Sequence, residues 1–88
     1  MNLKVKSSTS SLSLAGSIAK CVRNHTECEL SCVGAGSLNQ GVKAIAIANE
    51  YLKEDKYHLS CIPTFNDVII NDEKRSSINL KITVSDVE

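Results

Sequence analysis

The sequence predicts an α/β (α+β) two-layer sandwich, in which two helices cover one face of a mixed four-stranded sheet. Three observations lead to this prediction. Extended and helical hydrophobic patterns follow one another in the order β-α-β-α-β-β. The first two extended segments flank one helix, which is the pattern of two parallel strands joined by a helical crossover. The last two extended segments flank a short polar turn, as the strands of a hairpin do.

The first strand is expected at residues 2–7, where aliphatic side chains alternate with lysines. A serine-rich turn follows it. A helix is then expected over residues 11–23, because its apolar side chains fall within one half of the helical wheel. Asn24 is expected to end this helix, since asparagine is the best residue after glycine for a left-handed cap.

The second strand is expected at residues 27–33, and a helix at residues 37–53 follows it. Ser37 and Gln40 fit the S-x-x-Q capping box that marks the start of a helix. This helix is apolar over most of its circumference, which indicates burial on more than one side. In so small a chain, the second side is expected to belong to another subunit, so the sequence predicts a homodimer.

The last two strands are expected at residues 57–70 and 77–84, around the polar segment 71–75. Pro63 marks a bulge, an edge or a bend in the first of these strands, because proline cannot donate to a sheet ladder. The two strands form a long hairpin whose tip can project from the body. The sequence contains no internal repeat and no linker, so residues 1–88 are expected to form a single domain.

The charge of the chain is balanced overall but unevenly distributed. The formal net charge is zero, which argues weakly against nucleic-acid binding. Residues 1–26, however, carry four basic side chains and no acidic one. A positive end of this kind can attract nucleic acid. It can equally be an ordinary solvated surface, and composition does not decide between the two.

The hydrophobic segments are too short to enter a membrane. No stretch approaches the roughly 18 apolar residues that a membrane span needs. The apolar patch over residues 12–19 is interrupted by Ser13, Gly16 and Ser17, unlike the continuous hydrophobic region of a signal peptide. We therefore expect a cytoplasmic protein with no membrane partner.

The cysteines raise the question of a zinc site, because Cys21, His25, Cys28 and Cys32 are close in the sequence. In an extended strand, Cys28 and Cys32 would lie about 13 Å apart. Two sulfurs on one zinc ion must lie within roughly 4 Å of each other, and the Cα atoms of a disulfide within about 7 Å. We therefore expect the cysteines to be small buried hydrophobes, with no metal ion and no cofactor.

Enzymatic chemistry has little support in the sequence. No paired carboxylates and no histidine–nucleophile arrangement are present, so the protein is not expected to be an enzyme. The turn from Gly34 to Gly36 precedes a helix, as in some phosphate-binding loops, but the Walker lysine and the third Rossmann glycine are missing. A small-molecule substrate is therefore not expected.

One segment of the chain resembles a known family. Residues 34–48 read GAGSLNQGVKAIAIA and resemble the signature of the stage V sporulation protein S family, in which G-A-G-x-L-N-Q leads into an A-V-K-A-x-A-I-A helix. Residues 61–65, CIPTF, resemble that family's C-I-P-x-F strand, and residues 3–7 match its opening. Gly41 stands where an alanine is usual in the family. The resemblance implies an Alba-like fold, a homodimer, a nucleic-acid-binding surface and a regulatory role in bacterial sporulation and septation.

The resemblance also implies where nucleic acid would bind. In an Alba-like fold the loop after the first strand lies near the loop before the second helix. Lysines there would supply charge, hydroxyls and amides would fix register, and glycines would let the backbone approach a phosphate. The candidate residues in these two loops are Lys6, Ser7, Ser8, Gly34, Gly36, Ser37, Asn39, Gln40 and Lys43. The alternative for the glycines is a tight turn with no ligand.

Lys74 and Arg75 near the hairpin tip are further candidates that could reach a groove of the nucleic acid. Asp72 and Glu73 adjoin them, so all four side chains could simply solubilise a turn. The few aromatic residues make base stacking a poor model, which favours duplex or structured DNA or RNA held through its backbone. The alternative function is a protein–protein interaction scaffold of the same fold without nucleic-acid binding, which the near-zero net charge favours.

Overall fold

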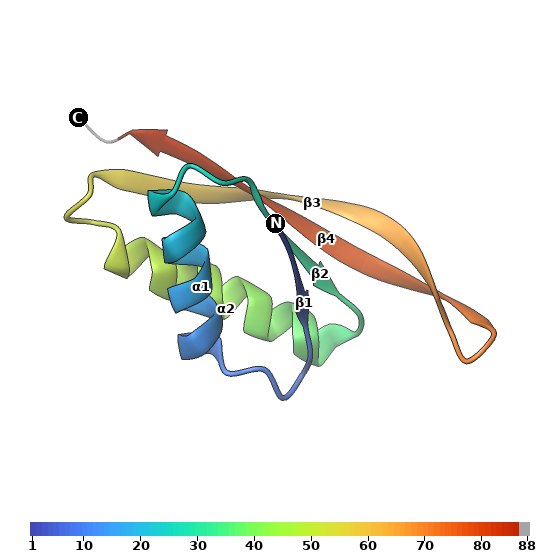
Figure 1. Cartoon of the computed structure of the whole chain (residues 1–88). Coiled ribbons are helices and arrows are strands. Elements are labelled where there is room, and N and C mark those ends of the chain that lie inside the picture. The colour runs from blue at the N-terminus through green and yellow to red at the C-terminus, as the bar shows by residue number, and fades with distance from the viewer. Residues whose placement is uncertain (87–88) are drawn as a thin grey trace.

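A computed structural model describes residues 1–86 and shows two layers, with both helices on one face of a mixed sheet (Figure 1). The strand order in the sheet is β1-β2-β4-β3. The predicted element order and fold class are therefore confirmed. The elements are β1 (Asn2–Val5), α1 (Ser11–Arg23), β2 (Cys28–Cys32), α2 (Ala35–Tyr51), β3 (Tyr57–Ile70) and β4 (Glu73–Asp86).

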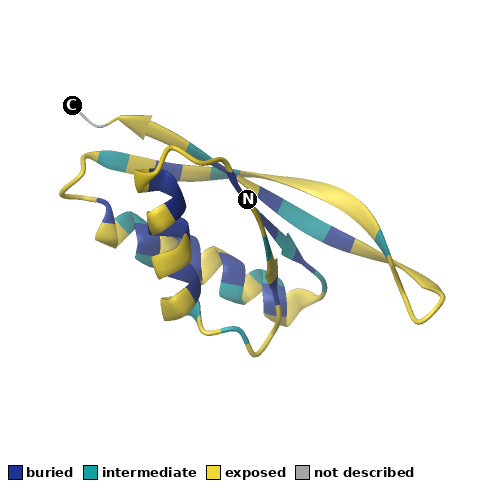
Figure 2. Cartoon of the chain, viewed as in Figure 1, coloured by how far each residue is buried: buried dark blue, intermediate teal, exposed yellow. Residues whose placement is uncertain are grey.

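The sheet has a covered face beneath the helices and an open face on its other side. β1 pairs with β2 in parallel, as expected from the helical crossover, and β4 pairs antiparallel with both β2 and β3. The side chains of directly paired residues point to the same face of the sheet, so the register shows which side chains lie on the covered face and which lie on the open face. The covered face carries the strand residues of the core, which include Val5, Cys28, Leu30, Cys32, Leu59, Leu80 and Ile82. Figure 2 shows that buried segments of the helices and strands concentrate between the two layers.

α1 begins and ends at well-defined caps. The Ser10 side chain accepts a hydrogen bond of 3.3 Å from the backbone N–H of Ser13. At the other end the left-handed residue is His25, with φ of 55°, so the prediction that Asn24 takes this role is wrong. Asn24 keeps a φ of −90° because its N–H still bonds to the Lys20 carbonyl and so continues the helix. The chain then turns toward β2 one residue later than expected.

α2 begins three residues earlier than the capping box predicts, because its N-cap is Gly34 and not Ser37. Gly34 is the N-cap, with φ of 92° and ψ of 158°, and no side-chain hydrogen bond caps the helix. The Ser37 hydroxyl donates to the carbonyls of Val33 at 2.7 Å and of Gly34 at 2.9 Å. The capping-box prediction is therefore wrong, because Ser37 lies inside the first turn and is 2% exposed. Serine here satisfies carbonyls of the preceding loop instead of helix N–H groups.

The two buried sides of α2 both have partners within the chain. One side packs on the sheet, where Gly41 approaches the side chains of Cys32, Leu30 and Leu80. The other side packs against α1. The second buried side therefore belongs to α1 and needs no other subunit, which removes the reason that the sequence offered for a homodimer. The homodimer itself remains a prediction.

β3 and β4 extend well beyond the rest of the sheet. The pairing of β2 with β4 ends at Cys32 and Ile78, whereas β3 and β4 remain paired as far as Ile70 and Glu73. Residues 66–77 therefore form a two-stranded arm, which gives the molecule a long dimension of 47 Å (Figure 1). Its tip is a two-residue turn in which both residues are left-handed, with φ of 51° at Asn71 and 62° at Asp72. This is the backbone pattern of a type I′ hairpin turn.

Three of the four cysteines are buried and Cys61 is partly buried, and all four are free thiols, as their expected role as small hydrophobes requires. In the part of the chain that the structure describes, no helix is long and apolar enough to cross a membrane.

Candidate nucleic-acid interface

The loop after β1 and the start of α2 lie side by side, as expected from the sequence. The Gln40 side-chain amide donates a hydrogen bond of 2.7 Å to the Thr9 backbone carbonyl. A Cβ atom built on Gly36 would lie only 3.0 Å from the Cβ of Ser7. Gly36 is therefore needed for the close approach of the two loops, and any larger residue would push them apart.

The loop after β1 is a tight turn that exposes its side chains. The Lys6 N–H donates to the Thr9 hydroxyl at 2.8 Å, and the Thr9 N–H returns a bond of 3.0 Å to the Lys6 carbonyl. These two bonds fix the backbone and leave the side chains of Lys6, Ser7 and Ser8 exposed. The loop therefore presents one ammonium group and two hydroxyls to solvent.

The start of α2 presents backbone donors beside this loop. No side chain caps the helix, and Gly34, Ala35 and Gly36 are exposed. The first N–H groups of a helix have no partner within it, and the helix dipole adds a positive partial charge there. A phosphate oxygen is a suitable acceptor for such a group of donors.

Two of the predicted side chains make hydrogen bonds within the protein and are not free to bind nucleic acid. The Ser37 hydroxyl is buried against two backbone carbonyls, and the Gln40 amide is bonded to Thr9. Their predicted role as side-chain contacts to nucleic acid is therefore not supported by the geometry. Both residues act on the surface indirectly, because they hold the backbone that forms it.

Asn39 and Lys43 are exposed on a different side of the molecule. The buried side of α2 is formed by Ser37, Gly41, Ala44, Ile45 and Ala48. At 100° per residue, Lys43 lies nearly opposite this group, so its ammonium group points away from the sheet. It does not share the open face on which Lys6 lies. Lys43 therefore forms no cluster with Lys6.

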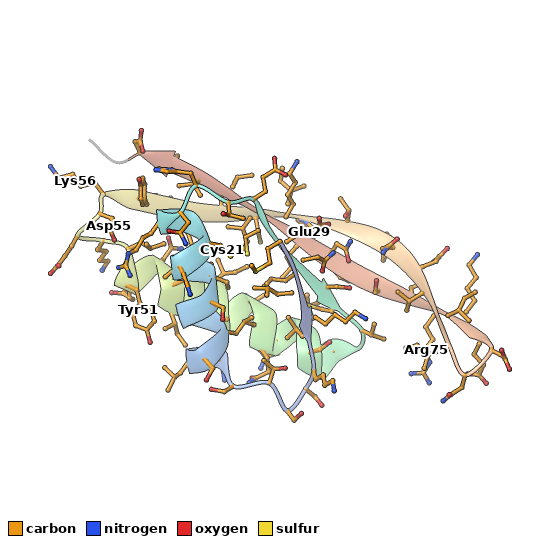
Figure 3. The ribbon with its side chains drawn as sticks, viewed as in Figure 1. Cys21, Glu29, Tyr51, Asp55, Lys56 and Arg75 are labelled. Carbon is orange, nitrogen blue, oxygen red and sulfur yellow. The ribbon has the colours of Figure 1, made fainter. Side chains whose placement is uncertain are left out.

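The two cations of the arm lie on opposite faces of it. Lys74 forms an ion pair of 3.2 Å with Asp67, and both side chains are well exposed. Arg75 pairs in register with Val68 and points to the other face, near the far end of the molecule (Figure 3). No carboxylate among residues 1–86 pairs with Arg75. Both residues lie in β4 and not in the turn, because β4 begins at Glu73 instead of residue 77.

A groove of about 510 Å³ separates the end of β1 from the arm on the open face. Lys4, Lys6 and Ser7 line one side of it, with Ser31 and Val33 below. The other side is formed by the last residues of β3, which are Val68, Ile69 and Ile70. The groove therefore combines a cationic wall with an aliphatic one.

The open face carries more cations than the whole chain suggests. By register and alternation, it holds four basic side chains against three carboxylates, those of Glu27, Glu29 and Glu73, although the net charge of the chain is zero. The cations are Lys4, Lys6, Arg75 and Lys81. Sequence reasoning missed Lys4 and Lys81 as candidates. Strict alternation in their strands would have placed both on the polar face.

One comparison with known proteins bears on this surface. The family model described as stage V sporulation protein S matches residues 1–85. The match spans both loops, the groove and the whole arm, and it agrees with the motifs in residues 34–48 and 61–65. A match over nearly the whole length shows that this chain belongs to the stage V sporulation protein S family, which implies a role related to sporulation.

Proposed function

We propose that the protein binds the sugar-phosphate backbone of duplex or structured DNA or RNA, and that it acts in this way as a regulator of sporulation and septation. The observation that carries the proposal is the gathering on the open face of cations that form no ion pair within residues 1–86. Lys4 and Lys6 line one side of the groove, and Arg75 projects from the arm on the same face. Backbone phosphates are the polymeric partner that such an arrangement fits.

The chemistry of the surface favours backbone contacts over base readout. Lysine and arginine neutralise phosphates. The hydroxyls of Ser7 and Ser8 and the first N–H groups of α2 can donate hydrogen bonds to phosphate oxygens and so fix the position of the protein along the nucleic acid. The chain has three aromatic residues, and the most exposed of them, Phe65, points to the covered side of β3. Base stacking on the open face would therefore lack a platform. A modest affinity with a strong salt dependence follows.

The functional unit that we propose is a homodimer. Phe65 is 83% exposed and Val42 is 51% exposed, and both lie on the side of the molecule where α2 runs beside β3. The placement of Val42 follows from Asn49, which is seven residues further along the same helix stripe and bonds to Leu59 of β3. Two copies that bury this surface would present two cationic faces to one nucleic acid, which raises the overall affinity.

The binding proposal is tested by fluorescence anisotropy with labelled duplex DNA and duplex RNA at low and near-physiological salt. Lys6→Gln and Arg75→Gln should each weaken binding and reduce the slope of log affinity against log salt by about one. Lys74→Gln is the matched control, because Lys74 is neutralised by Asp67 on the other face of the arm. Lys43→Gln tests the outer side of α2 in the same way.

Two results would overturn this proposal. If folded protein binds neither duplex at low salt, the function is not nucleic-acid binding, and a scaffold for protein partners becomes the better account. If Lys74→Gln and Arg75→Gln weaken binding equally, the open face is not the interface.

The dimer is tested separately by light scattering of the protein as it elutes from a sizing column. Phe65→Glu should convert a dimer to a monomer, because it would bury a charge in the interface. Ile62→Glu is the control, since Ile62 is 54% exposed on the open face of the same strand. A wild-type mass equal to one chain would exclude the dimer and leave the binding proposal intact.

A further inference from the structure

Three sulfur atoms from three separate segments meet at one edge of the core. The Cys21 Sγ lies 3.5 Å from the Met1 Sδ. Cys21 is on the inner side of α1 (Figure 3), and Cys28 is the first residue of β2. Both thiols are buried, with exposed fractions of 5% and 4%. The proposed nucleic-acid surface makes no use of this cluster.

Backbone hydrogen bonds hold Met1 directly beside Cys28. The Met1 amino group donates to the Glu27 carbonyl at 2.5 Å, and the Glu29 N–H donates to the Met1 carbonyl at 3.0 Å. These two bonds bracket Cys28 and continue the parallel register in which Asn2 is opposite Glu29. Residues opposite one another in register share a face of the sheet, so the side chains of Met1 and Cys28 point the same way.

The turn at the end of α1 brings Cys21 to the same place. The Thr26 N–H bonds to the Cys21 carbonyl at 2.9 Å, and His25 takes the left-handed conformation between them. The chain therefore reverses within a few residues, and Cys28 returns alongside the helix turn that carries Cys21. The two thiols interact: burial raises the pKa of the Cys28 thiol to about 12, and the neighbouring Cys21 adds to the rise.

The chemistry of this cluster suits a soft metal ion. Residues 1–86 bring together no group of three His, Cys, Asp or Glu side chains that could hold a metal, so a zinc or hard-cation site has no ligand set. Thiolate and thioether sulfur are instead the ligands that Cu(I) prefers.

We propose that Met1, Cys21 and Cys28 form a binding site for one Cu(I) ion, with two thiolate ligands and one thioether ligand. On binding, each cysteine S–H bond breaks, both protons pass to solvent, and two copper–thiolate bonds and one copper–thioether bond form. No electron is transferred, because the ion enters and stays as Cu(I). The site differs from the Cys28 and Cys32 pair considered in the sequence, whose side chains are four residues apart in one strand.

The ion has a route to the buried thiols. One surface depression is lined by Lys20, Cys21 and Met1, and a second by Cys28, Lys81 and Met1. Met1 is common to both and is 63% exposed, so its side chain covers the thiols from the solvent side. A rotation of this one side chain opens the site.

The first test uses the unmutated sequence, because the chain contains a single methionine. Protein in which that residue is selenomethionine is reduced, kept free of oxygen and loaded with one equivalent of Cu(I). X-ray absorption at the selenium edge should then show a copper neighbour at bonding distance. A selenium spectrum unchanged by Cu(I) would overturn the assignment of Met1.

The second test is competition for Cu(I) with the coloured chelator bicinchoninate. The wild-type protein should withdraw one equivalent of Cu(I) from the chelator. Cys21→Ser and Cys28→Ser should each lower the affinity by at least about 100-fold, since each removes a direct ligand. Cys32→Ala and Cys61→Ser are matched controls that should titrate as the wild type does. Failure to compete with the chelator, or equal losses in all four variants, would overturn the site.

Discussion

The side chain of Gln40 ties the first turns of α2 to the loop after β1, because its amide donates a hydrogen bond of 2.7 Å to the Thr9 carbonyl. Gln40 is separated from Thr9 by 31 residues, so this bond connects two distant parts of the chain. The same loop carries Lys6, Ser7 and Ser8. The position of the proposed binding surface therefore depends on a residue that does not belong to it.

Replacing Gln40 tests this dependence. Gln40→Met keeps the length of the side chain but removes the donor, and it should lower the free energy of unfolding by about 1 kcal/mol. Amide hydrogen exchange in the loop after β1 should also become faster. Asn39→Met is the control, because Asn39 is exposed and its side chain makes no hydrogen bond to residues 1–86. Equal effects of the two variants on urea unfolding would exclude the tether.

Two glycines should respond to alanine in opposite directions. Gly34 has a φ of 92°, which alanine adopts only with strain, so Gly34→Ala should cost about 1–3 kcal/mol. Gly16 lies within α1 with open space around it, so Gly16→Ala should stabilise the protein by up to about 1 kcal/mol. Thermal and urea unfolding of both variants measure the difference. A stabilised Gly34→Ala would contradict the left-handed backbone at the start of α2.

Gly41 is a more balanced case, because two effects of alanine oppose each other there. A Cβ at Gly41 would lie 3.1 Å from the Cys32 Sγ, so the helix-forming advantage of alanine is opposed by crowding. Cys32→Ala removes the sulfur atom. Gly41→Ala should therefore be more favourable by about 1 kcal/mol in the Cys32→Ala background than in the wild type. A double-mutant cycle of unfolding free energies measures this coupling, and additive values would exclude the contact.

Cys28 should make the protein less stable at high pH. Burial raises the pKa of its thiol from 9.0 to about 12, with a further contribution from Cys21. Above pH 9 the unfolded chain loses this proton while the folded chain keeps it, so ionisation favours unfolding. Stability should fall by up to about 1.4 kcal/mol per pH unit until the pH reaches the folded pKa.

The measurement is urea unfolding between neutral pH and pH 11 for the wild type and for Cys28→Ala. The variant should lose less stability than the wild type over the alkaline range, although its stability at neutral pH is lower. Parallel curves for the wild type and Cys28→Ala would contradict the raised pKa.

Local patterns predicted the elements better than their ends. Alternation in residues 2–7 and the 3.6-residue period in residues 11–23 placed β1 and α1 correctly, because each depends on neighbouring residues. The start of α2 was misplaced because Ser37 can bond to carbonyls of the preceding loop as well as to helix N–H groups. The start of β4 was misplaced because polar residues 73–76 lie in an arm with no covering layer, where no apolar pattern is needed.

The sequence predicted which loops form the candidate site, but not which side chains share one face of it. The neighbouring positions of the two loops followed from the family resemblance. The direction of each side chain depends on strand register and on its position around a helix. For this reason Arg75 and Lys74 lie on opposite faces of the arm, and Lys6 and Lys43 lie on different sides of the molecule. The meeting of Met1, Cys21 and Cys28 had no local signal, because it arises from parallel pairing between the ends of β1 and β2.

The length of β3 also affects how the protein avoids aggregation. β3 is an edge strand of 14 residues, and its unpaired N–H and C=O groups could template the growth of an intermolecular sheet. Pro63 lies near its middle and has no N–H to donate, so it divides the free edge into two short runs. A long strand that reaches out from the body can therefore remain exposed without starting a fibril.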